Sequence, residues 1–189
     1  MEGNAQLAVI IPMLKHVGAG IAPEQLNNPT PCALFSVSGV LEHMTGLASV
    51  YAPAFRGETP TDTTSSNRSD TEPVSAFDQA LDALLDAVQS PGALERTIDT
   101  PFGPMPGSTF ARLVAFDGLI HGWDLATSTQ QPWNPPENVV AEVDAFARQA
   151  IAPEMRDGDT FAQSIEPPSD ATPLARLVAF SGRNVATAV

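Results

Sequence analysis

Phe116-Asp-Gly-Leu-Ile-His-Gly-Trp-Asp-Leu-Ala126 is an apolar stretch interrupted by three ionisable residues, Asp117, His121 and Asp124. Each residue of an α-helix advances by about 100°, so these three side chains fall within roughly 60° of one another on one face. The same face carries the apolar residues Phe110, Leu113, Val114 and Ile120. A helix would bury such a face, and burying ionisable groups is costly unless they are paired or bind a metal. The stretch therefore predicts a core helix with a polar or metal-binding site.

Apolar side chains recur every three or four residues in further segments, which is the spacing of amphipathic helices. We expect helices over residues 5–21, 37–51, 74–88, 109–127, 137–151 and 174–183. Ser36 and Ser108 are suited to cap the second and fourth of these. Residues 97–102 are extended in character and Gly103–Gly107 suggests a turn. The chain is thus predicted to be all-α, an up-and-down four-helix bundle with a short additional C-terminal helix.

Length and composition indicate one domain over residues 1–189 with a substantial core, since 43% of the residues are hydrophobic. The formal net charge of -13 disfavours binding to nucleic acid or to an anionic membrane. No apolar run approaches the roughly 20 residues that span a bilayer, and the N-terminus lacks the positive region of a secretory signal. We therefore expect a cytoplasmic protein. The single cysteine, Cys32, excludes an intramolecular disulfide and a Cys-rich zinc site.

The segment from Gly57 to Pro73 is strongly polar. Such a composition cannot bury enough apolar surface to pack against a core. Long loops of this kind are lids or linkers, and we interpret this one as a linker. Cys32 lies in a proline-bounded loop, where a packed, inert thiol is a simpler interpretation than a fourth metal ligand.

Asp117 and His121 are four residues apart, a spacing that lets two helical side chains hold one ion. Helical ion pairs use the same spacing, so a structural pair remains an alternative. In helical bundles, metal sites are completed by ligands from facing helices. Asp124 could hold a histidine ring in place or act as an internal cap, and we favour the first role.

Two other histidines could supply a third ligand. His16 lies opposite the apolar stripe of its helix and is expected to be exposed. His43 lies at the edge of the apolar stripe of the second helix, and Gly39 and Gly46 leave space beside its ring. A boundary histidine bonded to a neighbouring carboxylate is the alternative for His43.

Taken together, Asn28-Pro-Thr-Pro-Cys32, Leu41-Glu-His43 and Leu119-Ile-His-Gly-Trp-Asp-Leu-Ala126 resemble the mycothiol-dependent maleylpyruvate isomerase N-terminal domain family, within the DinB-like group of metal-binding four-helix bundles. The resemblance implies that His43, Asp117 and His121 hold a divalent metal, commonly zinc, with nickel, iron or manganese as alternatives. Leu34-Phe35 stands where the family commonly has a tryptophan, so we expect different packing on the substrate side. We also expect this chain to lack the C-terminal domain of the isomerase.

The resemblance further implies a low-molecular-weight thiol, mycothiol, as cosubstrate and a small electrophile as substrate. Because metal coordination deprotonates a thiol, the expected function is that of a thiol S-transferase or a cis–trans isomerase. A non-catalytic, stress-associated metal-binding protein is the alternative, and a bundle with a purely structural polar network is a third. A homodimer is compatible with the sequence.

Overall fold

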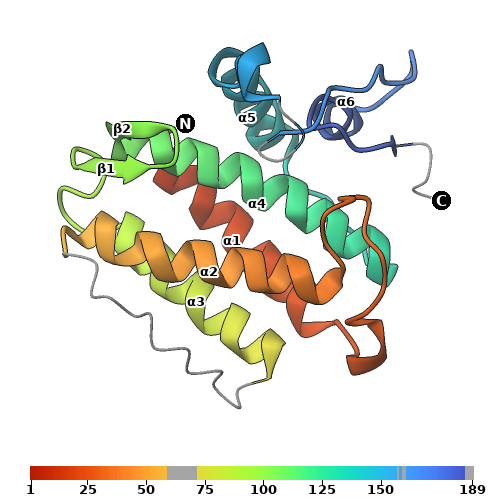
Figure 1. Ribbon diagram of the computed structural model, residues 1–189, viewed down its shortest axis with the longest axis horizontal. Coiled ribbons are helices and arrows are strands. Elements are labelled where there is room, and N and C mark those ends of the chain that lie inside the picture. Colours follow the sequence, from red (N-terminus) through yellow and green to blue (C-terminus); the bar gives the residue numbers. More distant parts are fainter. Residues whose placement is uncertain (59–71, 157, 159–160, 186–189) are drawn as a thin grey trace.

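The computed structural model describes residues 1–58, 72–156, 158 and 161–185. Four long helices form a bundle: α1 (Gly3–Ala19), α2 (Val37–Arg56), α3 (Pro73–Val88) and α4 (Gly107–Thr129) (Figure 1). Apolar side chains from all four fill one continuous core. The predicted all-α, four-helix bundle is therefore confirmed. Most of the polar segment that we interpreted as a linker lies outside the described residues.

The helix directions differ from the simple up-and-down alternation that we predicted, because α2 and α3, which follow one another in the chain, run the same way. α1 and α4 run parallel, since Gly3 lies against Ala111 near their starts while Gln131 donates a hydrogen bond to the Val17 carbonyl near their ends. α2 runs antiparallel to α4, because Phe55 stacks on Phe110 whereas His43 lies beside Asp117.

α3 runs antiparallel to α1, as Phe77 lies against Gly18 while Asp82 pairs with Lys15. α2 and α3 are consequently parallel. The chain therefore leaves α2 at one end of the bundle and enters α3 at the other end. The 16 residues between Arg56 and Pro73 permit this arrangement, because an extended chain gains about 3.3 Å per residue against 1.5 Å in a helix.

The starts of α2 and α4 are stabilised differently. Ser36 caps α2 as predicted, its hydroxyl accepting a hydrogen bond from the Gly39 amide at 3.2 Å. The predicted Ser108 cap is wrong, because α4 begins at Gly107 without any side-chain cap. The amides of Gly107 and Ser108 instead donate to the carbonyls of Arg96 and Leu94, at 2.7 and 2.9 Å. These carbonyls accept hydrogen bonds from amides of the first turn of α4, which a capping side chain would otherwise accept.

A small antiparallel hairpin precedes α4. It joins β1 (Thr97–Thr100) to β2 (Gly103–Pro106), with Ile98 opposite Met105. Our interpretation of Gly103–Gly107 as a turn is therefore wrong, since the turn lies at Pro101-Phe102. Prolines are tolerated in β2 because the hairpin has only two strands and both are edges.

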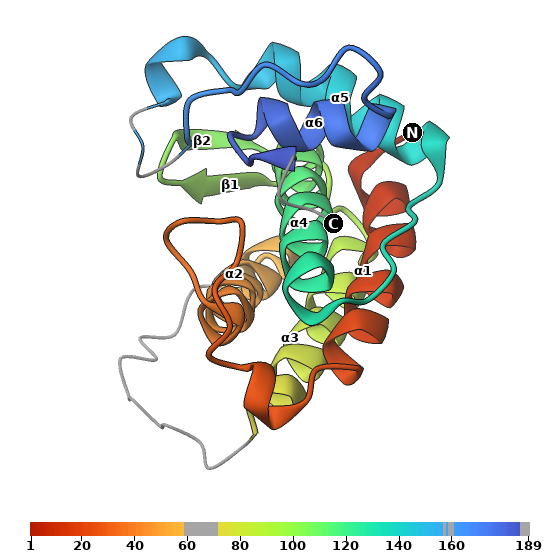
Figure 2. The same cartoon turned by 90° about the vertical axis from the view of Figure 1, so that its right-hand side faces the viewer.

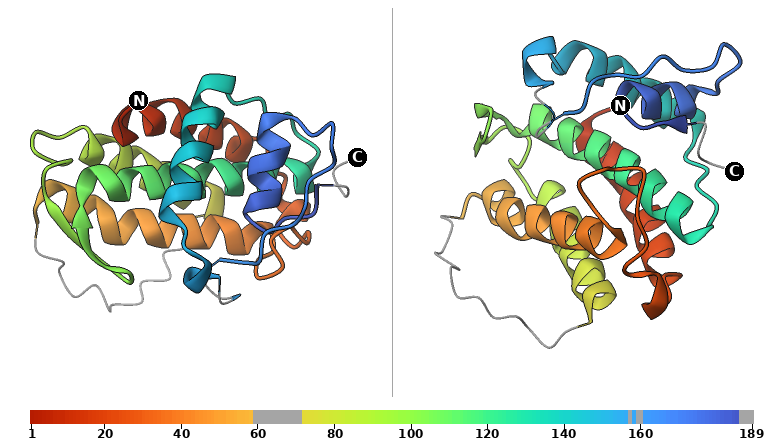
Figure 3. Two further views of the ribbon diagram at one scale, coloured as in Figure 1. Left: turned by 90° about the horizontal axis from the view of Figure 1, so that it is seen from above. Right: turned by 45° about the vertical axis from the view of Figure 1, so that its right-hand side comes forward.

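The C-terminal part of the chain forms a second layer outside the bundle. Helix α5 (Glu137–Ala150) packs on α4, and α6 (Pro173–Phe180) packs on α5 (Figures 2 and 3). Short 3-10 turns lie at Pro23–Gln25 and Pro153–Met155. Both predicted additional helices are thus present. Within the described part of the chain, none of the helices has the length and apolar character needed to cross a membrane.

Candidate metal centre

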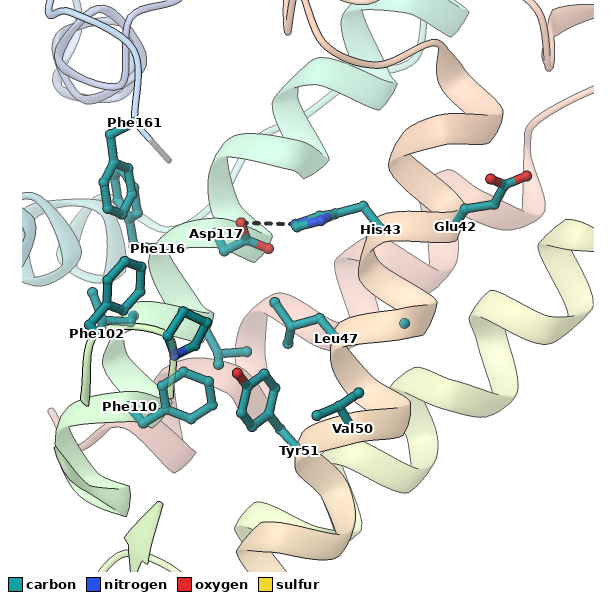
Figure 4. A pocket seen from close by; sticks show the side chains of 14 residues that line it. Glu42, His43, Leu47, Val50, Tyr51, Phe102, Phe110, Phe116, Asp117 and Phe161 are labelled. Carbon is teal, nitrogen blue, oxygen red and sulfur yellow. Dashed lines mark hydrogen bonds and ion pairs between the residues drawn. The ribbon is translucent and has the colours of Figure 1, made fainter. Parts of the chain in front are cut away.

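Helices α2 and α4 bring three potential metal ligands together. His43 comes from α2, and Asp117 and His121 come from α4. The Nε2 atom of His43 lies 3.4 Å from Oδ1 of Asp117, and the Nε2 atom of His121 lies 3.6 Å from the same oxygen (Figure 4 shows the first pair). One ligand atom from each residue falls within 4.8 Å of the others. The structure therefore assembles the three residues that the sequence singled out.

The two separations are informative because they are long for direct hydrogen bonds. Nitrogen–oxygen hydrogen bonds in proteins lie mostly between about 2.7 and 3.2 Å, and a contact at about 3.6 Å is not one. Ligands at about 2.0–2.1 Å from a tetrahedral zinc are roughly 3.3 Å apart. The spacing around Asp117 Oδ1 is therefore compatible with ligand atoms around an ion, and in the absence of an ion His43 and Asp117 form a long hydrogen bond.

Asp124 holds the His121 ring from the side opposite to Asp117. Its fully buried carboxylate accepts a hydrogen bond from Nδ1 of His121 at 3.0 Å. With a proton on Nδ1, the imidazole directs Nε2 toward Asp117 and His43, the orientation that a metal ligand needs. This geometry agrees with the role that we favoured for Asp124.

Arg183 completes this arrangement from the C-terminal layer. Its guanidinium donates from Nη2 to Asp124 Oδ2 at 3.0 Å and from Nε to Asp124 Oδ1 at 3.4 Å. Burial lowers the pKa of Arg183, but the adjacent Asp124 outweighs this effect and raises the pKa. The guanidinium is therefore charged and compensates the buried carboxylate that orients His121. Sequence reasoning did not find Arg183, because its partner Asp124 lies 59 residues earlier in the chain.

The local charges also shift the pKa of two of the three candidate ligands. Burial raises the pKa of the Asp117 carboxyl group, but His121 and His43 together outweigh burial and hold the pKa below its ordinary value. The hydrogen bond to Asp117 raises the pKa of the His43 imidazole above 6.5 despite burial, which lowers it. Asp117 is therefore ionised near neutral pH and available as an anionic ligand.

Aromatic rings enclose the site. Phe35 stacks on His43 with ring centroids 5.2 Å apart and contacts the edge of His121 at 5.9 Å. Phe35 belongs to the Leu34-Phe35 pair at which we expected altered packing, and in the structure it contacts both histidines. Cys32 is buried and free, and it lines the same side of the site.

Two pockets meet at these residues and share His43, Phe116, Asp117 and Phe161 in their walls. The larger pocket, which we call the apolar pocket, has a volume of about 560 Å³. It lies between α2, α4 and the hairpin, and Figure 4 shows Leu47, Val50, Tyr51, Phe102 and Phe110 around it. The smaller pocket, of about 340 Å³, has Cys32, His121 and Arg183 in its wall, and we call it the polar pocket.

The remaining sequence-based site predictions have clear outcomes. His16 is exposed on α1, as predicted. Gly46 does leave space, because a Cβ atom built there meets nothing within 4 Å, whereas one at Gly39 would approach Phe35 to 3.3 Å. Phe161, which follows α5 along the chain and reaches back to both pockets, was not anticipated because its long-range position has no local sequence signal.

Comparisons with known proteins give a family match and similar sequences. The sequence model of the mycothiol maleylpyruvate isomerase N-terminal domain matches residues 13–126, a range that contains His43, Asp117 and His121. An uncharacterized protein of Mycobacterium tuberculosis, found in strains CDC 1551 and H37Rv, is 30% identical over 176 residues, covering 88% of this chain and 90% of its own length. No solved structure matches significantly.

Proposed function

Because the chain belongs to the mycothiol maleylpyruvate isomerase N-terminal domain family, we propose that it is a divalent-metal-dependent protein that uses a low-molecular-weight thiol. In this proposal His43, Asp117 and His121 are the metal ligands and mycothiol is the thiol. The reaction is an S-transfer to, or a cis–trans isomerisation of, a small electrophile. The observation that carries the proposal is that one ligand atom from each of the three residues lies within 4.8 Å of the others, with Asp124 orienting His121.

The donor set favours zinc. Two imidazole nitrogens and one carboxylate oxygen are ligands that zinc accepts, and three protein ligands leave a coordination position for another molecule. Imidazole also suits nickel and iron, and carboxylate suits manganese, so these metals are the alternatives. A bound metal would supply Lewis acidity, which deprotonates a thiol and makes it nucleophilic near neutral pH.

The protein's own residues would position the metal ligands and exclude water from the site. Asp124 and Arg183 keep the His121 ring in one orientation, while Phe35 covers both histidines. The polar pocket reaches all three residues, and the apolar pocket reaches His43 and Asp117 from another side. Two molecules could therefore meet there, as a reaction between a thiol and an electrophile requires.

Metal content provides the first test. We expect protein purified without chelator to retain one divalent ion per chain, and both His43→Ala and His121→Ala to lose it while keeping wild-type helix content by circular dichroism. His16→Ala is the matched control, because His16 is an exposed histidine away from the site, and it should retain the ion. A wild-type metal content near zero would leave the purely structural network as the better explanation.

Thiol binding separates the enzymatic proposal from the non-catalytic alternative. The cobalt-substituted protein should develop a thiolate-to-cobalt charge-transfer band when it is titrated with mycothiol. The His121→Ala variant, treated in the same way, should show no such band. A wild-type protein that binds cobalt but shows no band at saturating thiol would favour a non-catalytic metal-binding protein.

A further inference from the structure

The apolar pocket contains few charged groups for a site in so acidic a protein. Among the described residues that line it there is no lysine or arginine. Its acidic residues are Glu42 and Asp117, and Figure 4 shows the Glu42 carboxylate directed away from the cavity. The charged part of the wall is therefore confined to the end that holds His43 and Asp117.

The rest of the wall is apolar apart from the Tyr51 hydroxyl, and five of its eleven residues are aromatic. Phe102 and Phe161 stack with centroids 6.2 Å apart, and Tyr51 lies 4.4 Å from Phe110. Phe102 is 44% exposed at the tip of the hairpin, a position where a large apolar side chain gains little from the protein's own core. A ligand between these rings would bury apolar surface that now faces solvent, which favours binding.

The volume of about 560 Å³ falls within the range of small-molecule pockets, roughly 300–1,000 Å³. It could hold two or three rings. One carboxylate of a dicarboxylate such as maleylpyruvate could lie beside His43 and a bound metal. The other would face described wall residues that include no lysine or arginine, and burying an unpaired charge is costly. Shape, size and charge thus point to an uncharged compound.

We propose that the apolar pocket binds an uncharged, mainly aromatic small molecule, and that this chain therefore takes a more apolar electrophile than the family's name implies. The role of the bound molecule as electrophile rests on the proposed function, but its binding does not require a metal. The polar pocket, with Arg183 in its wall, is left for the thiol.

The test uses two probes with the same ring system. N-phenyl-1-naphthylamine is uncharged and becomes fluorescent in apolar surroundings, while 8-anilinonaphthalene-1-sulfonate adds one sulfonate. The intact chain should bind the uncharged probe at least about tenfold more tightly than the sulfonate, since the charge would be desolvated without a partner. Equal or tighter binding of the sulfonate, or no binding of the uncharged probe, would overturn the proposal.

The Gly46→Leu variant tests whether the probe binds in the apolar pocket. Gly46 lies in the pocket wall with open space beyond its Cβ position, and leucine favours a helix more than glycine does. The variant should fold and should weaken binding of the uncharged probe at least about tenfold. Ser49→Leu adds the same side chain to an exposed position of α2 outside the wall and should leave binding unchanged.

Val50→Trp, at a 57% exposed position on the rim, provides a second obstruction. Unchanged probe affinity in both pocket variants would show that the probe binds elsewhere and would refute the proposal. The metal measurement above gives an independent result. Probe binding without metal retention would refute the proposed metal-dependent function but not the pocket's ligand class. Metal retention without probe binding would refute only the proposed ligand class.

Discussion

The pairing of Asp124 with Arg183 should make a large contribution to stability. The Asp124 side chain is fully buried and that of Arg183 is 13% exposed. Removing one partner of a buried ion pair typically costs about 3–5 kcal/mol, because the other charge is left buried without compensation. His121 still donates to Asp124 when Arg183 is removed, so we expect Arg183→Met to cost about 3 kcal/mol.

A double-mutant cycle in urea at neutral pH, with chelator present, measures the interaction. Asp124→Asn should cost about 2–3 kcal/mol, and the double variant should cost less than the sum by about 2 kcal/mol. Arg56→Met is the control, because Arg56 and Glu58 form an exposed pair of a kind that is worth about 0–1 kcal/mol. A coupling energy below about 0.5 kcal/mol would refute the argument that Arg183 compensates the buried carboxylate.

Metal affinity gives this pairing a second readout. Loss of a group that holds a ligating histidine typically weakens metal binding by about 10- to 100-fold. Asp124→Asn should therefore lower zinc affinity by at least about tenfold in a competition titration with a chromogenic chelator. Wild-type affinity in a folded Asp124→Asn variant would mean that Asp124 is only a structural group.

Three further outcomes are expected. Gly122→Ala should destabilise the protein by about 1–3 kcal/mol in urea, because its Cβ atom would lie 2.3 Å from the Trp133 ring; Gly46→Ala, in open space, should be neutral or stabilising. In the metal-free protein, NMR titration should give His43 a pKa above 6.5, and Asp117→Asn should lower it. Because the folded-state pKa is raised, the stabilisation from His43 is fully present below about pH 6.5 and is lost as the pH rises through the folded-state value; a His43 pKa unchanged by Asp117→Asn would contradict the assigned cause. Finally, zinc at 100 times its Kd should stabilise the folded chain by about 2.7 kcal/mol, seen as a rise in Tm that His43→Ala abolishes; an equal rise in that variant would contradict its role as a ligand.

Several features were predictable because they depend on residues close together in the chain. The apolar stripes give the helices, and helical geometry alone puts Asp117, His121 and Asp124 on one face. The Ser36 cap involves an amide only three residues away. The limits of such reasoning appear at Ser108, where carbonyls from the preceding loop replace the expected cap. They also appear at β2, which forms only because β1 is available to pair with it.

The sequence by itself thus determined the helices, the polar face of α4 and the residues suited to bind a metal. Only the tertiary structure decided the direction of each helix, the 3.4 and 3.6 Å separations around Asp117 and the two pockets that meet there. It also brought Arg183 to Asp124 across 59 residues of chain. The physical reason is that helix periodicity follows from local backbone geometry, whereas these contacts depend on how separate helices pack, and each element's own pattern is compatible with more than one partner.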